Sequence, residues 1–419
     1  MGSKPKVSQK SKCKFLDQFN PDLDSPARKT AISLLQMMIQ TNTVNPPGNE
    51  NQLAEKLQKW VKEQGFDFVK TTNLGKTPVR ANLIIEIPGT DPHNNPSWGF
   101  MSHIDVVPIE GNWEHQPFSG ELVQSEHDLF IWGRGAIDTK ALGAAHLTAA
   151  FTALKEGWRP KGNIKILLCA DEEQGGHEGM QWLVENHLDL IKCDCTLNEG
   201  GGFKLPLKND FVIQIGEKGT FWTKLKIKGK AGHGSSPPDY NITSIFKTIK
   251  ILNKIKNRKR NLVFGKEYLE TVAKVSIPGV VKGILKNKVL FKVMMALADK
   301  FTSLNVGQVF YPLVTDTIAV TNFHSGIKEN SLSPNAEIIL DIRSLPGRQR
   351  DDVNKMIQDI VGDKIWNELE WSGIENNPCT TSGIDNPYYS TIEKTLNEIY
   401  PGANIVPILS AGSTDCQYL

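Results

Sequence analysis

The chain has 419 residues, and its 48 lysines and arginines nearly balance its 46 aspartates and glutamates, which leaves a formal net charge of +2. Apolar residues make up 39% and charged residues 22%, a composition that excludes a mostly disordered chain, a collagen-like repeat and a coiled-coil rod. The balanced charge indicates neither a nucleic acid nor a membrane as partner, and the length suits two domains.

Six cysteines are scattered without zinc-finger or redox spacing, which is typical of a reduced, intracellular protein. The first residues are rich in lysine and serine, and no apolar secretory segment follows them. The most apolar stretch, near Val289–Leu297, is broken by lysine and is too short to span a membrane. We therefore expect a cytoplasmic protein without a membrane partner, and a flexible N-terminal segment over residues 1–25.

In the first half of the chain, helical and strand-like segments alternate. In chain order the patterns predict a helix at Pro26–Gln40, a helix at Leu53–Val61, strands at Ala81–Ile87 and Trp98–Met101, a helix from Asp138 to about Glu156, a strand at Asn163–Cys169, a helix at His177–Asn186 and a short strand at Cys193–Leu197. Such alternation predicts a layered α/β domain.

The second half has a different order. The patterns predict one long strand at Phe211–Ile227, an amphipathic helix at Ile242–Lys256, strands at Thr317–Phe323 and Glu337–Ile342, and a helix at Asp351–Val361. This order predicts an α+β, ferredoxin-like domain at 217–346, inserted into a catalytic domain formed by 26–216 and 347–419. The stretch Asn261–Val306 is expected to be a helical elaboration, and the basic run Lys254–Arg260 to be a solvated helix face.

Acids and one histidine follow the predicted strands. His103 and Asp105 come after the Trp98–Met101 strand, and their spacing of two puts both side chains on one side. A carboxylate in that place can orient an imidazole that binds a metal ion. A hydrogen-bonded pair at a strand end explains the same two residues without any metal.

Three further acidic motifs have similar positions. Asp138 ends the turn Gly133–Asp138 and could simply cap the next helix. Glu172 and Glu173 follow the Asn163–Cys169 strand, where adjacent carboxylates repel each other unless a cation neutralises them, although a solvated acidic turn is also common. Glu199 precedes three glycines that suit close approach to a ligand or a domain linker.

Together these motifs predict an oxygen-rich metal site with one imidazole. Because ligands gather at the carboxyl ends of strands in α/β sheets, the side chains are expected to meet. This donor set suits zinc, manganese or cobalt better than magnesium. Two such ions about 3.5–4 Å apart could share a bridging carboxylate and a hydroxide.

At this point the chain resembles the di-zinc metallopeptidases and amidohydrolases that include aminoacylase, glutamate carboxypeptidase, carboxypeptidase S, acetylornithine deacetylase and succinyl-diaminopimelate desuccinylase. The motifs that carry the resemblance run in order from about residue 30 to the end. They are Thr43–Glu50, Met101–Pro108, Trp113 with Pro117–Gly120, Gly133–Asp138, Asp171–Gly176 and Gly232-His233. The extra stretch after Asn261 is most similar to the carboxypeptidase S branch.

The resemblance implies a mixed-sheet catalytic domain with two zinc ions, for which cobalt or manganese could substitute. It implies that His103 and Glu199 bind one ion, that Glu173 binds the other and that Asp138 bridges them. Glu172 would then be the general base, and Asp105 would orient His103.

For the inserted domain the resemblance implies a lid that also forms a homodimer. His233 would reach the site of a neighbouring subunit, where it stabilises the oxyanion. Asn330 and Arg343 would hold the substrate carboxylate, and Gly412 would line the pocket. The implied substrates are small peptides or N-acyl amino acids. Without the resemblance, the favoured explanations are a loop histidine for His233 and a surface salt bridge for Arg343.

One feature departs from the family. The family's second zinc needs a histidine beyond the segment Gly412–Asp415, and no histidine follows His324 in this chain. We therefore expect a truncated C-terminus and a weak second site, with His177 as a less favoured substitute ligand. The leading hypothesis is a zinc-dependent carboxypeptidase, dipeptidase or N-acyl-amino-acid hydrolase. The alternatives are a catalytically impaired, truncated relative and a biosynthetic deacylase of the acetylornithine or succinyl-diaminopimelate type.

Overall fold

The computed structural model describes residues 25–124, 129–301 and 306–419, so the predicted flexible segment 1–25 lies outside it except for Ser25. The chain forms two compact units. Unit one comprises the residues up to Glu199 together with Tyr418 and Leu419, and unit two comprises Gly200–Gln417. Each unit is described by itself.

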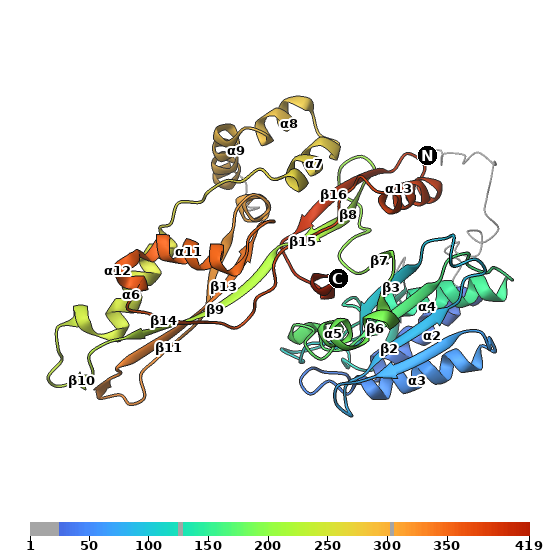
Figure 1. Ribbon diagram of the computed structural model, residues 1–419, viewed down its shortest axis with the longest axis horizontal. Coiled ribbons are helices and arrows are strands. Elements are labelled where there is room, and N and C mark those ends of the chain that lie inside the picture. The colour runs from blue at the N-terminus through green and yellow to red at the C-terminus, as the bar shows by residue number, and fades with distance from the viewer. Residues whose placement is uncertain (1–24, 125–128, 302–305) are drawn as a thin grey trace. The chain divides into compact units, whose positions relative to one another are not determined.

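Unit one is built around a mixed five-stranded sheet (Figure 1). Its strands, in spatial order, are β1 (Lys70–Leu74), β2 (Asn82–Ile87), β6 (Ile164–Cys169), β3 (Trp98–His103) and β7 (Cys195–Leu197). β3 runs parallel to both β6 and β7, whereas β1 and β2 are antiparallel to their neighbours. A separate hairpin pairs β4 (Glu121–Gln124) with β5 (Leu129–Trp132). The predicted α/β class is confirmed.

Helices cover this sheet. They are α2 (Pro26–Gln40), α3 (Glu50–Glu63), α4 (Lys140–Lys155), the short 3-10 helix η1 (Glu172–Gln174) and α5 (Met180–Ile191). α2, α3 and α4 bury their apolar faces in one core with Ile166 and Leu168 of β6, while Leu167 between them is buried on the opposite face. This alternation explains why β6 is apolar from Ile166 to Cys169, as strands covered on both faces are.

Unit two contains a four-stranded antiparallel sheet. Its strands, in spatial order, are β11 (Thr317–Ser325), β13 (Asn335–Ser344), β9 (Gly219–Lys228) and β14 (Glu370–Gly373). Helices α6 (Ser244–Lys256) and α11 (Arg350–Val361) share a core with it. This is the ferredoxin-like order, and its last strand lies beyond the predicted boundary at residue 346.

The predicted single strand at Phe211–Ile227 is wrong, because the structure divides it between two sheets. β8 (Asp210–Glu217) lies between β15 (Thr380–Thr381) and a parallel partner, β16 (Asn404–Ser410), whereas β9 belongs to the four-stranded sheet. The break falls at Lys218, which is buried and donates from Nζ to the carbonyl of Thr315 at 2.8 Å. The run Gly216–Gly219, which contains no apolar side chain, marks the break in the sequence.

The segment 261–306 contains helices, as predicted. They are α7 (Lys266–Lys274), α8 (Gly279–Leu285) and α9 (Lys288–Phe301), followed by α10 (Val306–Phe310) and the 3-10 helix η3 (Tyr311–Leu313). These helices share a core around Tyr268, Phe291 and Met295. Among the described residues, none of the helices is both long enough and apolar enough to cross a membrane.

The remaining elements of unit two are short or peripheral. They are the small paired strands β10 (Gly232–His233) and β12 (Ser331–Leu332), the helices α12 (Asp363–Trp366) and α13 (Pro387–Ile399), and the 3-10 helices η2 (Tyr240–Ile242) and η4 (Asp415–Tyr418).

Candidate metal centre

His103 is the last residue of β3 and is buried. Its Nδ1 lies 3.0 Å from the main-chain oxygen of Asp105, and its Nε2 lies 3.0 Å from Oδ1 of Asp138. The Asp105 carboxylate is slightly farther from Nδ1, at 3.4 Å. Asp105 therefore holds the ring chiefly through its backbone, which leaves Nε2 to face the acidic side chains.

The pKa of His103 is raised well above its usual value. Burial by itself lowers that pKa, but hydrogen bonds to Asp105 and Asp138 and the charges of Asp105 and Glu172 outweigh the effect of burial. This electrostatic field favours a positive charge at the end of β3, which a proton or a metal ion can supply.

Asp138 does not cap a helix. α4 begins at Lys140 with Thr139 as its N-cap residue, so the predicted helix start at Asp138 is two residues early. The Asp138 side chain is 69% exposed and bonds to His103 instead, which lowers the pKa of Asp138. The simple capping explanation of this residue is therefore wrong.

Glu172 and Glu173 lie on η1, directly after β6 and Asp171. Their main-chain N–H groups donate to the two carboxylate oxygens of Asp105, each at 3.2 Å. Asp105 thus positions both the histidine and the acidic turn, a role wider than the one predicted for it. Oε2 of Glu172 lies 4.0 Å from Nε2 of His103.

Burial raises the pKa of Glu173 to about 7. The charges of Asp138 and Asp105 act in the same direction, whereas His103 and the N–H of Val107 oppose them. Such a carboxyl group is costly to ionise among other carboxylates, and a bound cation would remove that cost.

Two overlapping sets of donor atoms meet here. One set is His103, Glu172 and Glu199, and the other is His103, Asp138 and Glu173, with the ligand atoms of each set within 4.8 Å of one another. Oε2 of Glu199, which follows β7, lies 3.8 Å from Nε2 of His103. One imidazole with several carboxylates is a donor set that suits zinc, cobalt or manganese. The five ligand and base residues predicted for unit one are therefore brought together.

A buried polar network, which sequence reasoning missed, supports this cluster. The amide nitrogen of Asn45 donates to Asp105 at 2.8 Å and to Asp171 at 3.0 Å, and its oxygen accepts from Arg80 at 2.8 Å. Arg80 also pairs with Glu50 at 2.6 Å and Asp171 at 2.8 Å. Burial raises the pKa of Glu50 to about 7, despite the opposing charge of Arg80. Asn45 and Glu50 lie in the Thr43–Glu50 motif, but no motif marks Arg80.

His177 is not part of either donor set. It is exposed, and its Nδ1 lies 2.6 Å from Oε1 of Gln181. The predicted helix at His177–Asn186 begins only at Met180, so His177 lies in the turn before it. The suggested role of His177 as a substitute ligand is therefore unsupported.

Two predicted residues of unit two, His233 and Asn330, lie together. β10 pairs with β12, which aligns His233 with Ser331, and the N–H of Gly234 donates to the carbonyl of Asn330 at 2.8 Å. His233 is exposed, with Nδ1 2.7 Å from Oγ of Ser235. The two residues are 97 positions apart in the chain.

Arg343 lies elsewhere in unit two, near the end of β13 where Thr220 is its partner in β9. Its guanidinium donates to both carboxylate oxygens of Asp341, at 2.8 and 3.2 Å, and to the hydroxyl of Thr220 at 2.9 Å. Gly412 follows β16 and is exposed, and its N–H donates to the Ser410 hydroxyl. The structure thus separates Arg343 from Asn330.

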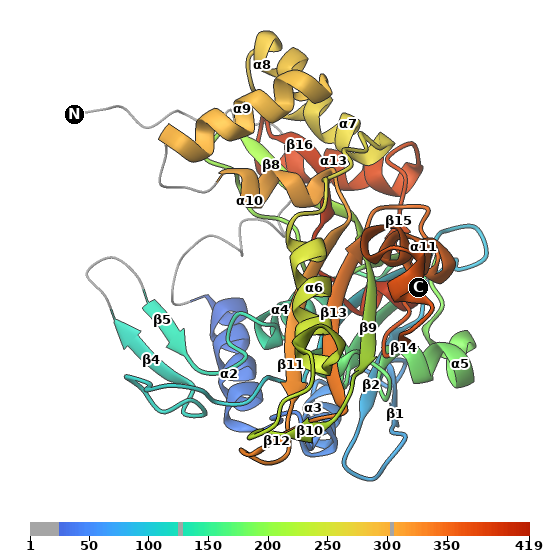
Figure 2. The same cartoon turned by 90° about the vertical axis from the view of Figure 1, so that its left-hand side faces the viewer.

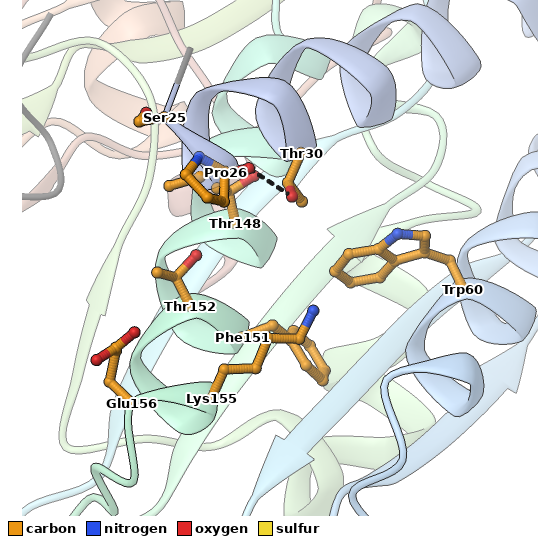
Figure 3. A pocket seen from close by; sticks show the side chains of 10 residues that line it. Ser25, Pro26, Thr30, Trp60, Thr148, Phe151, Thr152, Lys155 and Glu156 are labelled. Carbon is orange, nitrogen blue, oxygen red and sulfur yellow. Dashed lines mark hydrogen bonds between the residues drawn. The ribbon is translucent and has the colours of Figure 1, made fainter. Parts of the chain in front are cut away.

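A hollow of about 390 Å³ in unit one is a different feature (Figure 3). It lies between the start of α2, Trp60 of α3 and the last turns of α4, where Phe151 and Lys155 line it. These residues are at the opposite end of α4 from Asp138, and the hollow is lined by none of the donor residues. It is not the candidate metal centre.

The sequence of this chain is similar to those of named hydrolases from other organisms. The human protein N-fatty-acyl-amino acid synthase/hydrolase PM20D1 is 28% identical over 348 residues, an alignment that covers 80% of this chain and 66% of the human protein. Probable carboxypeptidase S-like 2 of Dictyostelium discoideum is 25% identical over 439 residues, which cover 97% of this chain and 80% of that protein. This chain therefore spans slightly less than two thirds of the human relative.

Solved structures share the fold. The M20 family metallo-carboxypeptidase Sso-CP2 of Sulfolobus solfataricus superposes with a TM-score of 0.67 at 18% identity, covering 93% of this chain and 87% of that one. The YXEP protein of Bacillus subtilis, described as a dinuclear metal binding peptidase, has a TM-score of 0.59 at 14% identity, with 94% and 86% covered. Residues 99–419 also match the family model described as peptidase family M20/M25/M40. The predicted resemblance is confirmed: this chain belongs to peptidase family M20/M25/M40, a family of hydrolytic enzymes.

Proposed function

We propose that this protein hydrolyses an amide bond next to a free carboxylate, as a carboxypeptidase, a dipeptidase or an N-acyl-amino-acid hydrolase. The observation that carries the proposal is the pair of overlapping donor sets around His103, one of which includes Glu172. The chain's membership of the family supports amide hydrolysis as the reaction. Relatives named as a carboxypeptidase and as an N-fatty-acyl-amino acid synthase/hydrolase support peptides and N-acyl amino acids as substrates.

The two donor sets share His103, so we divide their members between two divalent ions, zinc in the first place, as the resemblance implies. His103 and Glu199 would hold one ion and Glu173 the other, and the exposed carboxylate of Asp138 would bridge them. When bound, such ions lower the pKa of water and polarise a carbonyl group. The fixed main-chain contact of Nδ1 keeps Nε2 of His103 directed at the ligand position.

Glu172 would act as the general base. Its backbone is held by Asp105, and its carboxylate lies on the same side of His103 as Glu199. In the reaction Glu172 takes a proton from the attacking water while the water oxygen bonds to the amide carbon. When the carbon–nitrogen bond breaks, Glu172 returns that proton to the leaving amine.

Arg343 would bind the substrate carboxylate. Its contacts with Asp341 and Thr220 use three of the five guanidinium N–H groups and fix the plane of the guanidinium group. The two remaining N–H groups can donate to a substrate carboxylate, and Gly412 would line the same pocket. A held guanidinium loses little side-chain entropy on binding, which favours this role.

His233 and Asn330 would serve the site of a neighbouring subunit. They lie beyond the Lys228–Asn335 end of the four-stranded sheet, whereas Arg343 is eight residues farther along β13, or about 26 Å at 3.3 Å per residue. One carboxylate cannot reach both Asn330 and Arg343 of one chain. A homodimer resolves this separation, and the exposed edge strand β11 offers an edge through which two copies can pair.

The decisive experiment compares three variants of the zinc-loaded chain on a panel of dipeptides and N-acyl amino acids. We expect Glu172→Gln to lose turnover by about 10²–10⁴-fold while zinc content stays near that of the unchanged protein. Glu173→Gln should lose zinc as well as turnover. His177→Gln, an exposed neighbour outside the donor sets, is the matched control and should keep both.

The same measurements test the competing hypothesis of an impaired relative. Full turnover by Glu172→Gln would refute its role as base. At most one zinc per chain and no hydrolysis of any substrate by the unchanged protein would favour the impaired relative. A cytoplasmic location is likewise a proposal, which imaging of the tagged full-length protein would test.

A further inference from the structure

Helix α9 is apolar on two different faces. One face is buried in the core of the 261–313 region, where Phe291 and Met295 are almost fully covered. The other face carries Val289, Leu290, Val293 and Leu297, whose exposed fractions are 70%, 47%, 50% and 51%. Their positions repeat at intervals of three and four residues, so these four side chains form one continuous outer stripe. The core does not require them to be apolar.

The stripe lies in a strongly basic segment. Residues 275–301 contain five lysines and a single acid, Asp299, which gives this segment a net charge of 5 − 1 = +4. Lys286, Lys288, Lys292 and Lys300 are exposed, and the Asp299 carboxylate accepts the N–H of Gly307 at 2.7 Å. The whole chain has a net charge of only +2, so this segment is more basic than the chain as a whole.

Neighbouring helices also expose apolar side chains. Val280 of α8 is 78% exposed and Val309 of α10 is 63% exposed. Figure 2 shows α8, α9 and α10 gathered at one end of unit two, away from the tip formed by β10 and β12. A helix of 14 residues is about 21 Å long, too short to cross a bilayer but long enough to lie along its surface.

We propose that the outer stripe of α9 binds an anionic lipid surface. The exposed valines and leucines would enter the boundary between head groups and acyl chains, while the lysines would pair with lipid phosphates and carboxylates. A second copy of this chain is the less suitable occupant, because stacking two α9 stripes would bring two groups of lysines together without compensating acids. The proposal revises the expectation of no membrane partner and is independent of the proposed hydrolysis.

The test is flotation of the full chain with vesicles of phosphatidylcholine, made with and without phosphatidylserine. We expect binding only to vesicles that contain phosphatidylserine, and weaker binding as salt concentration rises. Val293→Asp with Leu297→Asp should abolish flotation. Lys288→Glu with Lys292→Glu should weaken it about tenfold or more, because each lysine contributes near the surface.

Two variants elsewhere on unit two serve as matched controls. Ile327→Asp changes an apolar residue that is 93% exposed, and Lys394→Glu reverses an exposed lysine, both outside the 261–313 region. Each should float like the unchanged protein, and circular dichroism should show that every variant is folded.

Three outcomes would overturn the proposal. The first is no flotation with phosphatidylserine at low salt, and the second is flotation that the α9 variants leave unchanged. The third is a change of oligomeric state, measured by light scattering, when Val293 and Leu297 are replaced while lipid binding stays the same. That third result would identify a second copy as the occupant.

Discussion

The side-chain amide of Asn45 connects Asp105 to Asp171, donating to the first at 2.8 Å and to the second at 3.0 Å. All three side chains are buried. Because Asp105 in turn accepts the N–H groups of Glu172 and Glu173, Asn45 is only two hydrogen bonds from the base and a ligand. The amide therefore holds two carboxylates in place without adding a charge of its own.

We predict that Asn45→Ala weakens zinc binding by about 10- to 100-fold, as loss of a residue that orients metal ligands typically does. The free energy of unfolding should fall by about 1–3 kcal/mol, because two buried carboxylates lose a donor. Competition with a chromophoric chelator measures the first quantity and urea unfolding the second. Asn94→Ala removes an exposed Asn–Asp hydrogen bond and should change neither quantity. Unchanged zinc affinity in Asn45→Ala would contradict the positioning role.

Gly48 is predicted to be irreplaceable beside the same network. Its φ is +104°, and a Cβ atom there would overlap the guanidinium of Arg80 and the carboxylate of Glu50. Gly48→Ala should therefore destabilise the protein by more than the roughly 1 kcal/mol typical of alanine at positive φ, and should weaken zinc binding. Gly65→Ala, at φ +77° with open space around it, is the control for backbone strain. Equal losses of stability and zinc affinity in the two variants would show that the Arg80–Glu50 contact is not disturbed.

The register of the sheet explains why the site was foreseeable from the sequence. β3 and β6 are parallel neighbours, and His103 lies opposite Cys169, so the residues that follow each strand emerge at the same edge. The helix predicted at Pro26–Gln40 has those bounds, because Ser25 caps it and Pro26 follows directly. Signals of this kind lie within a few residues of the element that they predict, so the sequence alone contains them.

Other features depend on contacts that no local pattern contains. Arg80 is 30 positions from Glu50 and 98 from Glu178, and nothing in its own neighbourhood distinguishes it from a surface arginine. The exposure of the apolar stripe of α9 depends on which face of the helix packs in the core, and the sequence alone does not show that. The division at Lys218 between two sheets is set by the pairing of β8 with β16 and of β9 with β13, which joins residues far apart in the chain.

Chelation should destabilise unit one. Asp138, Glu172, Glu173 and Glu199 surround a single imidazole, and without cations their charges repel one another. We expect the melting temperature to fall with a chelator and to recover with added zinc, whose binding at 100 times its Kd contributes about 2.7 kcal/mol. Glu173→Gln should reduce this response. His115→Ala removes an exposed His–Glu pair, to Glu121, outside the donor sets and should retain it. An identical melting temperature with and without zinc would refute the metal centre.

Lys218 should make the stability of the protein depend on pH. Burial lowers the pKa of this lysine to about 8, and the charge of Arg343 acts in the same direction against the opposing charge of Asp316. Its side chain is buried and donates to the carbonyl of Thr315 at 2.8 Å. In the unfolded chain the pKa returns to about 10.4, so between pH 8 and 10 the unfolded state binds more protons than the folded state. Stability contributed by this residue therefore rises with pH in that window.

The measurement is the difference in unfolding free energy between the unchanged protein and Lys218→Met at two pH values. Both proteins share every other titrating group, so the change in this difference isolates Lys218. From pH 7 to pH 9.5 the difference should move by about 2 kcal/mol in favour of the lysine, since one pKa unit corresponds to about 1.4 kcal/mol. Lys328→Met, at an exposed lysine in the same unit, should show no such movement. A constant difference for Lys218→Met would mean that this lysine keeps its ordinary pKa at the junction of β8 and β9.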